Sequence, residues 1–91
     1  MSRNRNYRKE NLMKRYGISL EDYDSMLVEQ GFVCAICGKE CRKNLWLSVD
    51  HNHKNGEVRG LLCDDCNNGL AKFFDDVDLL QKAIEYLNER Q

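Results

Sequence analysis

The spacing of apolar residues predicts two short helices in the first third of the chain. A helix over residues 7–16 ends at Gly17, and a second helix begins after Ser19, which forms a capping-box pattern with Asp22, and ends at Gly31. The residues that mark one face of these helices are Leu12, Met13 and Tyr16 in the first and Leu20, Tyr23, Met26, Leu27 and Gln30 in the second. We expect the apolar stripe of the second helix to lie in the core.

Two extended runs in the middle of the chain predict a hairpin. The first run covers residues 46–51 and the second covers residues 58–62, and both are rich in strand-forming side chains. Residues 52–57 connect them and contain the turn-forming pair Asn55 and Gly56. The pattern therefore predicts two antiparallel strands joined by a short loop.

Two helices are predicted to close the chain. A short helix begins at Asp64 or Asp65 and runs to Phe73, and a last helix is capped by Asp75 with Asp78 at the capping-box position. The apolar face of the last helix consists of Leu79, Leu80, Ala83, Ile84 and Leu87, which we expect to pack into the core. The order of elements predicts a small α+β fold with a ββα unit at its centre.

The composition indicates one small domain without a membrane span or an export signal. The core of a 91-residue chain supplies only a few kcal/mol of stability, so a bound metal is a frequent addition at this size. No run approaches the roughly 20 apolar residues of a membrane helix. The N-terminus also lacks the apolar stretch of a signal peptide. We expect no membrane partner and a reducing, cytoplasmic location.

Charge is distributed unevenly along a chain whose formal net charge is −1. Basic residues gather within residues 1–15, whereas acidic residues predominate in residues 75–91. The basic side chains nearest the N-terminus are Arg3, Arg5, Arg8 and Lys9. The sequence leaves open whether this run contacts the phosphates of a nucleic acid or is only a solvated surface.

Four cysteines form two C-x-x-C pairs, Cys34 with Cys37 and Cys63 with Cys66. Two such pairs fill the four tetrahedral positions of Zn²⁺ and leave no position for water, which is typical of a structural site. Cys41 is a fifth cysteine that permits an alternative ligand set, but the symmetric pairs favour its role as a free bystander.

Ligands of a different kind lie between and beside these pairs. Asp50 and His51 end the first predicted strand, His53 follows in the connecting loop, and Asn67 directly follows Cys66 in the short helix. Carboxylate and amide oxygens suit a hard ion such as Mg²⁺ or Mn²⁺, and an imidazole near neutral pKa suits a general base. The sequence thus predicts a closed sulfur site that supports an open, chemically active one.

At these residues the chain resembles the HNH, or ββα-metal, nucleases, and within them the phage recombination endonuclease VII family. The resemblance extends from about Tyr16 to Leu87. The stretches that carry it are Tyr16-Gly17-Ile18, Glu21-Asp22-Tyr23, the pair Cys34 and Cys37, Val49-Asp50-His51-Asn52-His53, Val58-Arg59-Gly60-Leu61-Leu62-Cys63, and Cys66-Asn67 with Gly69-Leu70. Each stretch alone is a weak signal, but their ordered combination is specific.

The resemblance implies a role for each matching residue. Asp50 and Asn67 would hold a catalytic Mg²⁺ or Mn²⁺, and His51 would be the general base of phosphodiester hydrolysis. His53 would either orient the scissile phosphate or merely close its loop. The residues that would hold structural Zn²⁺ are Cys34, Cys37, Cys63 and Cys66.

The same resemblance implies a DNA endonuclease of phage or prophage origin that acts in the host cytoplasm. We expect a monomer or homodimer that nicks DNA with low sequence specificity, because no segment offers an obvious base-reading pattern. The expected organisation is a basic helical segment over residues 1–31, a zinc-clamped core over 32–74 and a packing helix over 75–91, all in one domain.

Several alternatives remain open from the sequence. In one alternative interpretation, the chain is a zinc-ribbon module that binds nucleic acid or a protein partner and catalyses no reaction. In that interpretation His51 is a loop histidine and Asn67 simply caps its helix. Lys54 and Arg59 flank the presumed active loop, where each either meets a DNA phosphate or is ordinary surface charge.

Overall fold

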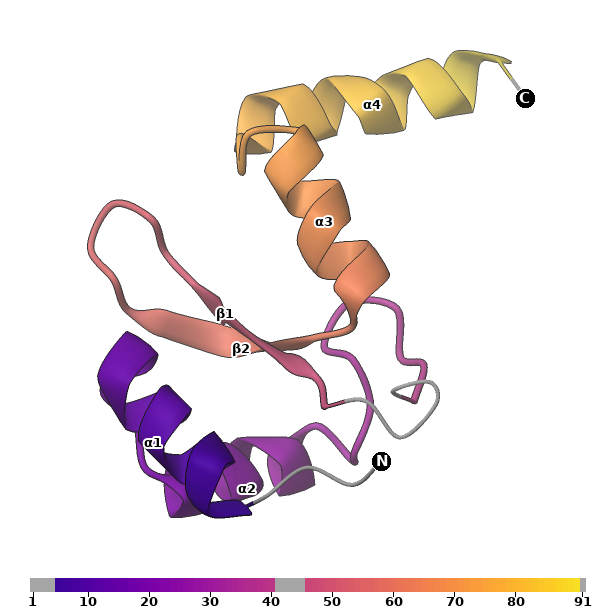
Figure 1. Cartoon of the computed structure of the whole chain (residues 1–91). Helices are drawn as coiled ribbons and strands as arrows, with labels where there is room; N and C mark the ends of the chain where they lie inside the picture. The colour runs from indigo at the N-terminus through magenta and orange to yellow at the C-terminus, as the bar shows by residue number, and fades with distance from the viewer. Residues whose placement is uncertain (1–4, 41–45, 91) are drawn as a thin grey trace.

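The computed structural model describes residues 5–40 and 46–90, and the side chains of residues 5–9 are left out of the description. Two of the residues singled out in the sequence, Arg3 and Cys41, therefore lie outside the described residues. The elements follow the order α1 (Arg5–Tyr16), α2 (Leu20–Glu29), β1 (Ser48–His51), β2 (Val58–Leu62), α3 (Asp64–Lys72) and α4 (Val77–Arg90). The predicted α+β order with a central ββα unit is confirmed (Figure 1).

Local signals define both N-terminal helices. Gly17 adopts a φ of 68°, which ends α1, and its N–H donates to the Met13 carbonyl at 3.0 Å. At the start of α2 the Ser19 hydroxyl accepts from the Asp22 N–H, and the Asp22 carboxylate accepts from the Ser19 N–H. The predicted capping box is thus confirmed, and it satisfies two backbone donors that a helix start leaves without partners.

The two strands form an antiparallel hairpin with an irregularity at the end that carries Asp50 and His51. Asp50 pairs with Gly60, but His51 pairs with Val58, so Arg59 is an extra residue on β2. Such a bulge bends the strand and turns a side chain in a new direction. β1 is shorter than predicted. It begins at Ser48, whereas the predicted run began at residue 46.

The core lies where α1 and α2 meet the hairpin. Its buried residues are Leu12, Leu20, Tyr23, Cys34, Leu47, Val49, Leu61 and Leu62. Tyr23 is fully buried and its hydroxyl donates to the Leu47 carbonyl at 2.6 Å, which satisfies both groups away from water. The expectation that the apolar stripe of α2 contributes to the core is confirmed by Leu20 and Tyr23.

One amide side chain joins three segments of the structure. Gln30, the residue that ends α2, donates through Nε2 to the carbonyls of Val33 at 2.8 Å and Leu61 at 3.0 Å. Its Oε1 accepts from the Leu61 N–H at 2.9 Å. Gln30 therefore pairs with β2 as a neighbouring strand residue would, and it ties α2 and the first cysteine turn to the hairpin.

The C-terminal helices differ from the prediction in two respects. α4 is capped by Asp76, whose Oδ1 accepts from the N–H groups of Asp78 and Leu79, and not by Asp75 as predicted. Asp75 has a φ of 55°, which is unlike the extended conformation of a helix-capping residue, and its carboxylate binds Arg59 instead.

The expectation that α4 packs into the core is also wrong. α4 has no buried residue, and Ile84 and Leu87 on its apolar stripe remain 51% and 58% exposed. Figure 1 shows α1 and α2 on one side of the hairpin, α3 on the other, and α4 extending away from them. Within the described residues, no helix has the length and apolar character needed to cross a bilayer.

Candidate metal centre and active site

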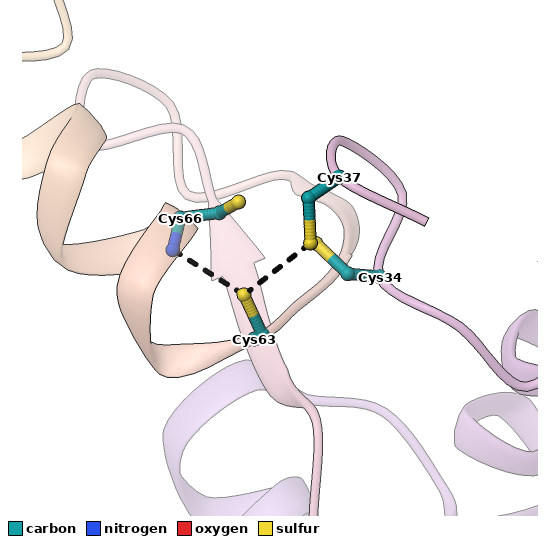
Figure 2. Close-up of side chains that lie close together, drawn as sticks. All are labelled: Cys34, Cys37, Cys63 and Cys66. Carbon is teal, nitrogen blue, oxygen red and sulfur yellow. Dashed lines mark hydrogen bonds between the residues drawn. The ribbon is translucent and has the colours of Figure 1, made fainter. Parts of the chain in front are cut away.

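Two tight turns bring the four paired cysteines together. Cys34 and Cys37 lie in the turn after α2, where Gly38 has a φ of 73° and donates its N–H to the Cys34 carbonyl at 3.0 Å. Cys63 follows β2 and caps α3, and Cys66 lies in the first turn of that helix. Figure 2 shows the four sulfur atoms pointing toward one another.

The distances within this cysteine cluster fit a tetrahedral zinc ion. All four Sγ atoms lie within 4.8 Å of one another, and the Sγ atoms of Cys37 and Cys63 are 3.8 Å apart. A Zn–S bond of about 2.3 Å places sulfurs about 3.8 Å apart across a tetrahedral site. Backbone N–H groups also point at the sulfurs, from Ile36 to Cys34 Sγ and from Cys66 to Cys63 Sγ, both at 3.4 Å.

The acidity of the thiols indicates that the cluster needs a cation. Burial raises the pKa of the Cys34 thiol, but hydrogen bonds with the backbone of Cys63, Cys37 and Ile36 outweigh burial and lower that pKa to about 6. Burial and the neighbouring sulfurs raise the pKa of Cys66 to about 12. The protein alone therefore disfavours the thiolate of Cys66, whereas a divalent ion bound beside its sulfur would favour it.

The Asp50 carboxylate is nearly buried at the end of β1, with an exposed fraction of 9%. Arg59 reaches it from the bulge, with Nε 2.7 Å from Oδ2 and Nη2 3.0 Å from Oδ1. The same guanidinium binds Asp75, with Nη1 3.0 Å from Oδ2 and Nη2 2.9 Å from Oδ1. Hydrogen bonds to Asp50 and then to Asp75 raise the pKa of Arg59, which therefore stays charged.

His51 lies between two other rings. The centroid of its imidazole is 4.6 Å from that of His53 and 5.5 Å from the ring of Tyr16 in α1. His51 is half-buried, whereas His53 is exposed. The Tyr16 contact comes from the first helix, so the N-terminal segment restrains the imidazole predicted to be the base.

Asn67 sits in the first turn of α3 and is half-buried. Its N–H donates to the Cys63 carbonyl at 3.0 Å, so the backbone of Asn67 is held one helical turn after a cysteine of the cluster. α3 lies against both strands of the hairpin, which carries Asp50 and His51. The roles predicted for Asp50, His51, His53 and Asn67 stay predictions.

The oxygen donors of Asp50 and Asn67 fit a hard divalent ion in kind. Within residues 5–40 and 46–90, the cysteine cluster is the one place where three or more Cys, His, Asp or Glu ligands converge. Mg²⁺ commonly uses only one or two protein ligands and keeps several waters, so a second all-protein cage is not required. Asp50 already binds a cationic group, the guanidinium of Arg59.

The basic residues considered for nucleic-acid contact fall into separate places. Lys54 is exposed in the hairpin loop, where its N–H donates to Asn52 Oδ1 at 2.8 Å. Arg59 is engaged by Asp50 and Asp75. The remaining side chains, those of Arg5, Arg8 and Lys9, lie on α1 in the segment whose side chains are not described.

Sequence reasoning missed two residues that contact this site. Asp75 is 16 residues from Arg59 along the chain and matched a helix-cap pattern, so no local signal indicated its ion pair. Tyr16 entered the sequence prediction as part of a weak apolar edge and not as a neighbour of His51. Both contacts depend on how separate elements pack.

Comparison with known proteins gives consistent results. The family model described as recombination endonuclease VII matches residues 9–89. The Gene 59 proteins of Mycobacterium phages D29 and L5 are each 43% identical over 79 residues; the alignments cover 86% and 84% of this chain and 48% and 47% of those proteins. The chain spans about half the length of these curated relatives.

A solved structure is also similar to this one. The ββα-Me type II restriction endonuclease Hpy99I is 34% identical in sequence and superimposes with a TM-score of 0.59, covering 91% of this chain and 49% of that one. The fold, the ordered cysteine pairs and the family match over residues 9–89 agree with one another. This chain belongs to the recombination endonuclease VII family.

Proposed function

We propose that this chain is a metal-dependent DNA endonuclease that hydrolyses phosphodiester bonds. The observation that supports this most is the placement of a nearly buried carboxylate, Asp50, next to His51 at the end of β1, opposite the bulge in β2. The ring centroid of His51 lies 4.6 Å from that of His53. Bulges are frequent beside active sites because they redirect side chains. Family membership connects this arrangement to nuclease chemistry.

In the proposed reaction, His51 removes a proton from a water molecule. The water oxygen bonds to phosphorus in line with the scissile bond, and the bond to the 3′ oxygen breaks. A divalent ion such as Mg²⁺ or Mn²⁺, when bound by Asp50 and Asn67, supplies positive charge to the oxygen that becomes negative. His53, whose ring centroid is 4.6 Å from that of His51, orients the phosphate in this proposal.

The two metals have different tasks in this proposal. Zn²⁺ in the cysteine cluster is structural, because four sulfur ligands leave no open position for water. It connects the turn after α2 to the start of α3 and so locates Asn67 relative to the hairpin. The core over residues 32–74 is then the catalytic unit, with residues 1–31 and 75–91 attached to it in one domain.

We further propose that the substrate is DNA, nicked with low sequence specificity by a monomer or homodimer in the cytoplasm of a phage-infected host. Each chain has one proposed active site, so each chain cuts one DNA strand at a time. Phosphate contacts from Lys54 and the basic N-terminal helix would provide affinity that falls as salt concentration rises.

The test is a plasmid-nicking assay with zinc-loaded protein. His51→Ala should lower the rate by about 100- to 10,000-fold, the usual contribution of a general base. The control is Glu57→Ala, an exposed residue of the same loop, which should retain activity. Activity should disappear in EDTA under conditions that spare the zinc and return with Mg²⁺ or Mn²⁺.

Two outcomes would contradict the proposal. Unchanged nicking by His51→Ala, with its zinc retained, would remove His51 as the base. A wild-type chain that binds DNA but never cleaves it in Mg²⁺ or Mn²⁺ would instead be a zinc-dependent binding module. Zinc content and thermal unfolding of each variant distinguish lost chemistry from lost structure.

A further inference from the structure

Arg59 creates an electrostatic difficulty for the proposed active site. Its guanidinium binds both oxygens of Asp50, at 2.7 Å and 3.0 Å. A divalent cation held by Asp50 would approach a carboxylate whose negative charge is already compensated, and it would also meet the positive charge of Arg59 itself. Taken alone, this ion pair weakens the attraction of Asp50 for a metal ion.

Asp75 restores the missing negative charge. It binds the far side of the same guanidinium at 2.9 Å and 3.0 Å, so the formal charge of the three groups is −1 + 1 − 1 = −1. The hydrogen bonds from Arg59 hold the pKa of Asp75 below its ordinary value of 3.8, so Asp75 is ionised at neutral pH.

The backbone at this position is consistent with a constrained role. Asp75 and its neighbour Phe74 have φ values of 55° and 57°, in the left-handed region that non-glycine residues seldom adopt. These residues form the junction between α3 and α4. The junction turns the carboxylate back toward the hairpin, where it meets Arg59, while the next residue, Asp76, caps α4.

We infer that Arg59 and Asp75 are positioning residues that set the affinity of Asp50 for a divalent cation. Arg59 orients the Asp50 carboxylate through a two-point contact, and Asp75 supplies the charge that keeps the group attractive to a cation. This inference rests on the proposed function, because it assumes that Asp50 is a metal ligand.

The experiment measures Mn²⁺ affinity of the zinc-loaded full chain without DNA, from the electron paramagnetic resonance signal of free Mn²⁺. Asp75→Asn leaves a neutral group of three and should weaken Mn²⁺ binding roughly tenfold, as is common for residues behind a metal ligand. Asparagine tolerates the left-handed conformation, so the junction should keep its shape. Adding Arg59→Met to Asp75→Asn removes the uncompensated positive charge and should recover most of the lost affinity.

The matched control is Asp78→Asn, which removes the same charge from the start of α4 and should leave Mn²⁺ affinity unchanged. Recovery of Mn²⁺ affinity in the double variant is the decisive result. If each substitution merely damaged the structure, the second would not restore the affinity lost through the first. If Arg59→Met fails to fold, Arg59→Gln provides the same charge change. Unchanged affinity in Asp75→Asn, or a double variant no better than Asp75→Asn, would overturn the inference.

Asp50→Asn separates this inference from the proposed function. If Asp50→Asn binds Mn²⁺ as wild type does, Asp50 is not a metal ligand and the proposed function fails. If Asp50→Asn abolishes the site but Asp75→Asn has no effect, the proposed function stands and the role of Asp75 is rejected.

Discussion

The guanidinium of Arg59 meets the carboxylate of Asp50 edge to edge, with Nε 2.7 Å from Oδ2 and Nη2 3.0 Å from Oδ1. This contact exists because Arg59 is the extra residue of a bulge opposite the boundary between Asp50 and His51. Burying a carboxylate costs free energy unless a charged group pairs with it, and Arg59 is that partner for Asp50. The bulge therefore provides both the bend of the strand and the charge that accompanies Asp50.

The Arg59–Asp75 ion pair predicts a dependence on pH. Since Arg59 lowers the pKa of Asp75 in the folded state, the pair stabilises the fold above the ordinary Asp range and loses this contribution as pH falls through the lowered pKa. A carboxyl ¹³C titration by NMR should give wild-type Asp75 a midpoint below the ordinary pKa of an aspartate. In Arg59→Met the titration should shift to higher pH, and an identical curve would contradict the pairing.

The buried hydroxyl of Tyr23 should contribute measurably to stability. Tyr23→Phe leaves the Leu47 carbonyl without the donor that lies 2.6 Å away, which should lower the free energy of unfolding by about 1–3 kcal/mol. Urea denaturation in the presence of zinc measures the difference. Tyr86→Phe, on the exposed surface of α4, is the matched control and should have little effect. Equal stability of the two variants would count against the described hydrogen bond.

Gln30 is expected to hold the second strand to the first cysteine turn. Gln30→Ala removes both hydrogen bonds to Leu61 and the one to Val33. The Leu61 carbonyl still accepts from the Ala35 N–H, so we expect a loss of about 1–3 kcal/mol, mainly from the Leu61 N–H. The exchange rate of the Leu61 amide hydrogen should also rise, because this N–H loses its acceptor on Gln30. Gln81→Ala, exposed on α4, serves as the control. Unaltered protection at Leu61 would refute the pairing.

Zinc and fold should be lost together. Cys37→Ser removes one of four ligands, so we expect the variant to bind less zinc and to unfold, because a small domain gains much of its stability from such a site. Metal analysis and far-ultraviolet circular dichroism give the two readouts. Cys41→Ser should retain one zinc ion per chain and the wild-type spectrum. Zinc loss in Cys41→Ser would show that the ligand set differs from the paired cysteines.

The ring of Tyr16 should restrain the proposed base. Tyr16→Ala removes the contact with His51 at a centroid distance of 5.5 Å, and we expect kcat for nicking to fall by up to about 100-fold with a smaller change in KM. Tyr16→Phe keeps the ring and should stay near wild type. Met13→Ala, exposed on the same helix, is the control. A Tyr16→Ala variant with wild-type kcat would show that the ring contact has no part in the reaction.

Much of the architecture was predictable because its signals are local. The Ser19–Asp22 capping box and the turn residues of the hairpin each act on neighbours a few residues away, and each forms as predicted. The paired cysteines were equally predictable, since a fixed ligand spacing reflects the coordination geometry of the metal.

The errors arose where a residue had two possible partners. Asp75 was predicted to cap α4, but its carboxylate binds Arg59 of β2 and Asp76 caps the helix instead. The apolar stripe of α4 satisfied the pattern of a core helix, yet whether such a stripe is buried depends on having a neighbouring surface, and α4 extends away from the hairpin.

Helix caps, turns and metal-binding pairs are encoded by neighbouring residues, so the elements, their order and the sulfur ligands could be predicted from the amino-acid sequence. The three-dimensional packing was needed to show that Arg59 lies between Asp50 and Asp75, that Gln30 pairs with Leu61, and that Tyr16 contacts His51. These contacts join residues from different elements, and their formation depends on how the bulged hairpin packs against the helices on either side.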